Sequence, residues 1–176
     1  LAYKKSPRHM PKAYLDDVIA SAQNVVNRTK SICVGLEPCV IPALGHSNFK
    51  IEDGTMEFGV GHHGEAGTKV EKLKSASEMA QEMAETILND FDFEEGKEVA
   101  VMLSGLGATP VMELYVLYDE VEKVLAKAGH KVWKTYIGNY VTSLDMNGAS
   151  LTIVDLDDEI KELLSEPAVP IGMKNY

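Results

Sequence analysis

Residues 55–68, Thr-Met-Glu-Phe-Gly-Val-Gly-His-His-Gly-Glu-Ala-Gly-Thr, constrain the fold of this chain more than any other stretch. The first half, residues 56–61, is predicted to be a short strand. The second half is too rich in glycine for a helix or a strand, because glycine accepts positive φ angles and loses the most entropy when it is ordered. His62, His63 and Glu65 lie within this permissive backbone. An imidazole can attack a carbonyl, bind a metal or relay a proton near neutral pH, so we expect chemistry at this strand end.

The spacing of apolar residues elsewhere predicts an alternation of helices and strands. Apolar residues recur every three or four positions in residues 14–30, 77–88, 110–128 and 157–164, and short apolar runs occupy residues 32–35, 99–103, 132–137 and 151–154. Thr109 before Pro110 is a standard helix start, and the helix that follows is expected to bury Val111 and Tyr115 among other residues. The charged residues 69–74 are expected to link the loop to the next helix. This order predicts an α/β fold, two-layer or sandwich, with a mixed sheet in a single domain.

The remaining composition concerns domain organisation and the classes of partner. Residues 1–13 are polar and basic, so we expect an N-terminal arm or junction and assign residues 14–176 to one domain. The net charge of −10 argues against nucleic acid and anionic membrane as partners, because these attract clustered Lys and Arg. No apolar run approaches the roughly 20 residues that span a bilayer, and a cytoplasmic location is expected. Cys33 and Cys39 lack Cys-x-x-Cys spacing and are predicted to be buried free thiols.

The residues alone leave other sites open. The turn Gly105-Leu106-Gly107 before a helix is compatible with phosphate binding, but it lacks the third glycine of a dinucleotide site and the lysine of a P-loop. Tight packing of a strand against a helix explains it equally well. A metal-dependent hydrolase using His62, His63 and Glu65 is a second alternative, although adjacent residues of a strand point to opposite faces. A structural role for one of the two imidazoles is a third.

Several blocks of the sequence resemble one enzyme family in the same order along the chain. These blocks are Met-Glu-Phe-Gly-Val-Gly-His-His-Gly-Glu-Ala-Gly at 56–67, Gly-Leu-Gly-Ala-Thr-Pro at 105–110, Met-Glu-Leu-Tyr at 112–115, and Gly-Asn-Tyr-Val-Thr-Ser-Leu-Asp-Met at 138–146, with shorter ones at 39–43 and 155–159. Together they are similar to the substrate-binding subunit of dihydroxyacetone kinases, over residues 14–167. The resemblance implies the fold of the second domain of that subunit.

The resemblance also implies a chemistry for the loop. In the family, a loop histidine adds through its imidazole to the carbonyl of dihydroxyacetone and gives a hemiaminal, which distinguishes a ketone from glycerol. That position falls on His63, and Gly64 and Glu65 complete the implied substrate-binding residues. Our own addition is that Glu65 orients the imidazole. His62 stands where the family usually has an apolar residue, so the choice between the two histidines stays open.

The implied function is that of a dihydroxyacetone kinase component in glycerol metabolism. The resemblance implies no cofactor on this chain, because ATP or ADP with Mg would be held by a nucleotide-binding kinase subunit or domain. It also implies a homodimer. The match covers only the second half of the substrate-binding subunit, so we expect the acid/base residues on a missing first half and an incomplete enzyme in this chain alone. The alternative is a non-catalytic paralogue that senses dihydroxyacetone as a co-regulator.

Overall fold

The computed structural model describes residues 15–47, 49–63, 65–90, 96–170 and 172–173. The chain divides into two compact units, one formed by Leu1–Thr29 with Val154–Tyr176 and the other by Lys30–Ile153. The N-terminal arm predicted for residues 1–13 lies outside the described residues, and the assignment of residues 14–176 to one domain stays a prediction. Among the described helices, none combines the length and the apolar character needed to cross a bilayer.

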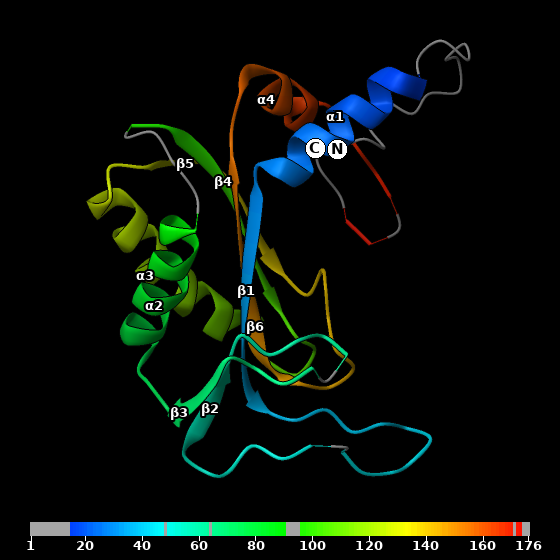
Figure 1. The fold of residues 1–176 in the computed structure, drawn as a ribbon, viewed down its shortest axis with the longest axis vertical. Coiled ribbons are helices and arrows are strands. Elements are labelled where there is room, and N and C mark those ends of the chain that lie inside the picture. The colour runs from blue at the N-terminus through cyan, green and yellow to red at the C-terminus, as the bar shows by residue number, and fades with distance from the viewer. Residues whose placement is uncertain (1–14, 48, 64, 91–95, 171, 174–176) are drawn as a thin grey trace. The chain divides into compact units, whose positions relative to one another are not determined.

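A six-stranded sheet runs through the fold with the strand order β3-β2-β1-β6-β4-β5 (Figure 1). The strands are β1 (Thr29–Glu37), β2 (Thr55–Phe58), β3 (Lys69–Lys72), β4 (Glu98–Gly105), β5 (Lys131–Gly138) and β6 (Asn147–Asp155). β4 and β5 pair in parallel, whereas β2 pairs antiparallel with both β1 and β3. The predicted α/β fold with a mixed sheet is therefore confirmed.

Two helices of the second unit, α2 (Ala76–Asn89) and α3 (Val111–Lys127), lie on the same face of this sheet (Figure 1). Ser75 begins α2 with a capping box, in which its hydroxyl accepts from the Glu78 amide and the Glu78 carboxylate accepts from the Ser75 amide. The core between the layers contains Met79, Met83, Ile87, Leu114, Leu117, Val121 and Leu125 from the helices and Val99, Val101, Leu103, Leu151 and Ile153 from the strands. Removing this apolar surface from water, at roughly 25 cal/mol per Å², holds the helical layer on the sheet.

Three local predictions were wrong. Residues 69–72 form strand β3 rather than a link, and their charges are tolerated because an edge strand reaches solvent. Thr109 does not cap α3; its hydroxyl donates to the backbone oxygen of Gly148 at 2.6 Å, and Pro110 is the N-cap without a side-chain bond. Val111 and Tyr115 of α3 are exposed, because the helix turns Leu114 and Leu117 toward the sheet instead.

The first unit contains α1 (Leu15–Asn27) and α4 (Asp158–Ser165). Polar contacts join them: Ser21 Oγ donates to Glu159 Oε1 at 2.5 Å, and Asn24 Nδ2 donates to Asp157 Oδ2 at 2.8 Å. Asp157 also caps α4 by accepting a hydrogen bond from the Ile160 amide. These contacts explain how two short helices with many charged residues pack together.

Candidate functional site

Residues 59–68 connect β2 to β3, and we call them the histidine loop. It lies on the side of the sheet away from α2 and α3 (Figure 1). The Gly59 amide donates to the Cys33 oxygen at 2.7 Å, so the loop starts against β1. Inside the loop the Gly61 amide donates to the Glu65 oxygen at 3.0 Å. Glycine at position 61 leaves room for the Glu65 side chain, which would have to shift if a Cβ were added there.

His63 and Glu65 form the exposed pair of the loop. The His63 side chain is 89% exposed, and its Nδ1 lies 3.2 Å from Glu65 Oε1. The second carboxylate oxygen accepts a hydrogen bond from the His63 amide at 2.9 Å. Hydrogen bonds from the backbone amides of Glu65 and His63 lower the pKa of the Glu65 carboxyl, so the carboxylate is ionised near neutral pH. Gly64, the third predicted binding residue, lies outside the described residues.

His62 occupies a different environment from its neighbour. Its Nδ1 lies 4.0 Å from the Cys33 sulfur, and its backbone oxygen accepts a hydrogen bond from Ser143 Oγ at 2.5 Å. Burial raises the pKa of the Cys33 thiol to about 11, so this neighbour is a neutral, weakly polar group. Cys33 and Cys39 are both free and buried, as predicted. The two histidines are therefore distinct: His62 packs against β1, and His63 faces solvent.

The different environments of His62 and His63 bear on the hypothesis that this loop binds a metal ion. A metal site needs at least three donor side chains that converge on one point. Among the residues that the structure describes, no group of three or more His, Cys, Asp or Glu side chains is placed to hold an ion. Glu65 and His63 in contact are only two donors, fewer than such a site needs.

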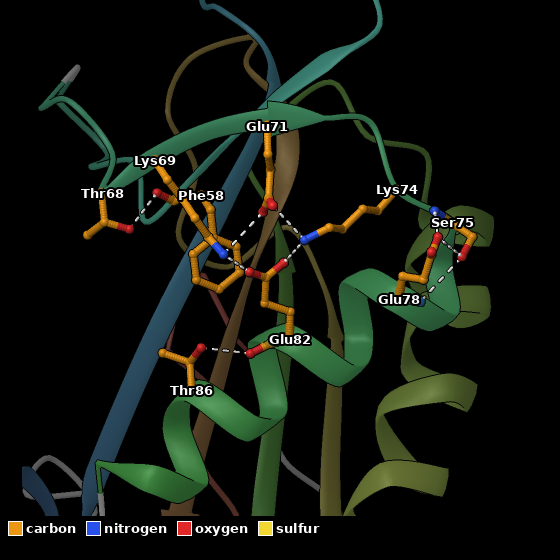
Figure 2. A network of polar contacts seen from close by, with 9 residues as sticks. All are labelled: Phe58, Thr68, Lys69, Glu71, Lys74, Ser75, Glu78, Glu82 and Thr86. Carbon is orange, nitrogen blue, oxygen red and sulfur yellow. Dashed lines mark hydrogen bonds and ion pairs between the residues drawn. The ribbon is translucent and has the colours of Figure 1, made fainter.

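The outer strand of the hairpin is fixed to α2 by charged side chains (Figure 2). Lys69 and Lys74 both form ion pairs with Glu82, and Lys74 Nζ lies 2.6 Å from Glu71 Oε2. Lys69 Nζ also lies 5.0 Å from the centre of the Phe58 ring. Burial alone would raise the pKa of Glu82, but hydrogen bonds from the two lysines lower it below its ordinary value. Since β3 is largely exposed, these ion pairs supplement its backbone bonds to β2.

The turn Gly105-Leu106-Gly107 uses its backbone amides internally. The Leu106 amide donates to the Gly148 oxygen at 3.1 Å, and the Ala108 amide donates to the Met146 oxygen at 3.0 Å. Gly107 has a φ of 135°, and a Cβ there would overlap the Leu144 oxygen. Close packing therefore explains both glycines of this turn without a phosphate, against the Leu144 backbone at Gly107 and against the Asn139 side chain at Gly105.

The structure adds residues that sequence reasoning missed. The Ser143 amide donates to the Leu106 oxygen at 2.7 Å, and its hydroxyl reaches the histidine loop. Asp145 Oδ1 accepts from the Val40 amide at 2.7 Å. Both residues lie in the block at 138–146 that resembles the dihydroxyacetone kinases, which was the available signal. That block gave neither residue a role, because their partners are about 40 to 105 positions away in the sequence.

Comparisons with known proteins agree with this block pattern. The family profile described as the Dak1 domain matches residues 9–171. The dihydroxyacetone-binding subunit DhaK of a PTS-dependent dihydroxyacetone kinase from Listeria innocua is 40% identical over 147 residues, which are 84% of this chain and 45% of that protein. Thus the chain spans less than half the length of this curated relative.

Two solved structures share the fold at 28% sequence identity. The dihydroxyacetone kinase operon co-activator DhaQ superimposes with a TM-score of 0.81 over 87% of this chain and 48% of its own. The dihydroxyacetone kinase of C. freundii superimposes with a TM-score of 0.78 over 86% of this chain and 28% of its own. A kinase and a co-activator thus both resemble this chain.

Proposed function

Because the chain belongs to the Dak1 domain family, we propose that it is the dihydroxyacetone-binding component of a dihydroxyacetone kinase and holds the ketone as a hemiaminal on His63. The observation that carries this proposal is the exposed His63 imidazole with Nδ1 beside the Glu65 carboxylate. A carboxylate accepts a hydrogen bond, so this contact favours the tautomer with the proton on Nδ1. The lone pair then resides on Nε2.

The proposed step is an addition without loss of atoms from the substrate. The Nε2 lone pair of His63 forms a bond to the carbonyl carbon, and the carbon–oxygen π bond breaks. The oxygen takes a proton from solvent, and Nδ1 releases its proton toward Glu65 and then to solvent. The product is a neutral hemiaminal in which the hydroxyl groups of dihydroxyacetone remain free for phosphorylation. Glycerol has no carbonyl and cannot react in this way.

The phosphoryl group is proposed to come from a partner. We propose that a separate nucleotide-binding subunit or domain holds the nucleotide together with Mg. This nucleotide is either ATP or ADP that a phosphotransfer system recharges. The chain is further proposed to act in the cytoplasm as a homodimer within a longer subunit. Light scattering of the purified protein tests the dimer, because a mass equal to one chain contradicts it.

The test of ketone capture uses dihydroxyacetone labelled with ¹³C at the carbonyl carbon. Capture moves the ¹³C signal from the carbonyl region to that of a carbon bearing four single bonds. We expect this signal with the unaltered chain and with His62→Ala, and its loss with His63→Ala. Its loss with His62→Ala alone would transfer the role to His62. Its absence from the unaltered chain would contradict capture by this chain.

A second candidate function is a dihydroxyacetone-sensing co-regulator that transfers nothing. The likeness to the co-activator DhaQ favours it, since that structure matches at a TM-score of 0.81. Both candidates bind the ketone, so binding does not separate them. Phosphorylation of dihydroxyacetone, followed by ³¹P NMR with the full-length protein, its nucleotide-binding partner and the phosphoryl donor, would identify the kinase component. Ketone binding without phosphate transfer under those conditions would identify the co-regulator.

A further inference from the structure

We propose that Ser143 is a positioning residue for the histidine loop and acts through the backbone oxygen of His62. Its consequence for catalysis rests on the proposed capture of ketones by His63. The contact is specific: Ser143 Oγ donates to the His62 oxygen at 2.5 Å, and the serine is only 5% exposed. A hydrogen bond shielded from water is stronger than an exposed one. Because His62 and His63 share a peptide bond, this anchor lies immediately before the reactive residue.

Ser143 is itself held in place by its backbone. Its amide donates to the Leu106 oxygen at 2.7 Å, and its oxygen accepts from the Met146 amide at 3.0 Å. The next residue, Leu144, has a φ of 50°, which is unfavourable for a branched side chain. Such a conformation persists only where the surroundings determine it. The turn at Ser143 is therefore a rigid support from which the hydroxyl reaches the histidine loop.

Gly107 makes this support possible. A side chain at position 107 would overlap the Leu144 oxygen, so the turn could not lie against β4. Other contacts at the same place are weaker. Cys39 Sγ lies 4.0 Å from Ser143 Oγ, and Cys33 Sγ lies 4.0 Å from His62 Nδ1. Sulfur is a poor hydrogen-bonding partner, so the serine hydroxyl is the stronger link between the turn and the loop.

The two sides of His63 therefore have different supports. Ser143 fixes the side of the loop that precedes His63, and Glu65 contacts His63 from the other side. Addition to a carbonyl requires the attacking nitrogen within about 3–3.5 Å of the carbon and in line with it. Loss of the Ser143 anchor would let His63 sample orientations that do not react. We thus assign Ser143 to the alignment of His63 and not to contact with the ketone.

The experiment compares Ser143→Ala with Ser21→Ala. Ser21 is a matched control, since it is 3% exposed and its hydroxyl makes a 2.5 Å hydrogen bond in the other unit. Hydrogen exchange of the Gly61 amide, measured by NMR without ketone, reports the order of the loop. We expect about tenfold faster exchange at Gly61 in Ser143→Ala, and about tenfold weaker capture of ¹³C-dihydroxyacetone, as for one buried hydrogen bond. Ser21→Ala should leave both unchanged.

Two further variants make the outcome decisive. Ser143→Thr keeps the hydroxyl and should restore both readouts, and Ser143→Cys should be intermediate because a thiol is a weaker donor. Unchanged exchange at Gly61 in Ser143→Ala would overturn the proposal, as would equal changes in Ser21→Ala. If Ser143→Ala does not fold, equal exchange in Ser143→Cys and the unaltered chain would overturn it. If Gly61 exchanges faster in Ser143→Ala but the unaltered chain captures no ketone, the positioning role is supported and the proposed function is contradicted.

Discussion

The carboxylate of Glu65 contacts His63 at two atoms: one oxygen accepts from the backbone amide at 2.9 Å, and the other lies 3.2 Å from Nδ1. This bidentate contact fixes the imidazole relative to its own backbone. It also favours a proton on Nδ1, which leaves the lone pair on Nε2, the atom proposed above to attack the ketone. Glu65 can contact His63, two positions before it, because the loop folds back and the Gly61 amide donates to the Glu65 oxygen.

Glu65→Gln is expected to weaken ketone capture about tenfold, because the charge-assisted contact to Nδ1 is lost. The pKa of Glu65 is lowered, so the folded chain gains stability from its carboxylate above the ordinary carboxyl pKa. That contribution is lost as the pH falls through the lowered value, below about 4.5. Ketone capture is measured by ¹³C NMR at pH 7 and pH 8. The ratio of capture by the variant to capture by the unaltered chain should therefore be the same at both pH values. Glu85→Gln is the control, because Glu85 is an exposed carboxylate of α2 that accepts from Gln81 Nε2 at 2.9 Å. An equal loss there would contradict the orienting role.

Glu82→Gln is expected to lower the free energy of unfolding by about 1 kcal/mol, because two lysines lose their shared partner. The effect should shrink in high salt, which screens partly exposed ion pairs. The pKa of Glu82 is lowered, so this stabilisation is present above the ordinary carboxyl pKa and disappears as the pH falls through the lowered value. Urea unfolding at low and high salt measures it. Lys123→Gln, which removes exposed pairs on α3, should change stability little, and a matching loss there would refute the special role of Glu82.

Gly107→Ala is expected to destabilise the chain by about 3 kcal/mol, since the added Cβ overlaps the Leu144 oxygen and the backbone has a φ of 135°. The urea midpoint should fall. The turn at Ser143 should also shift, so Gly61 exchange should become faster. Gly172→Ala is a suitable control, because no atom lies within 4 Å of its Cβ position. Equal stability of Gly107→Ala and Gly172→Ala would disprove the close packing of Gly107 against Leu144.

Cys33 is expected to resist alkylation in the folded chain. Its pKa is raised to about 11 by burial, so roughly one thiol in a thousand is ionised at pH 8. The raised pKa means that stability is intact below the unfolded value of 9.0 and declines as the pH rises from there toward 11. Iodoacetamide labelling with peptide mapping, with and without urea, checks the resistance to alkylation, and urea unfolding between pH 8 and pH 11 checks the decline in stability. Rapid labelling of Cys33 without urea would contradict its burial.

Much of the fold could be predicted because it depends on local patterns. The apolar run at residues 99–103 is β4, and the 3- and 4-residue spacing of Met79, Met83 and Ile87 is the buried side of α2. Strand β3 was missed because its sequence, Lys-Val-Glu-Lys, lacks an apolar run. Its identity as a strand comes from backbone bonds to β2 and from ion pairs with α2, which no local window contains.

For the site, the sequence by itself determined the glycine-rich loop, the adjacent histidines and the family to which they belong. The sequence did not settle which histidine faces solvent, because the two imidazoles lie in a turn rather than in a strand. Only the tertiary structure decided that His62 is the one against β1 and that Ser143 supports it. Sequence patterns encode burial and local geometry, whereas a hydrogen bond between Ser143 and His62 depends on how distant segments meet across the folded sheet.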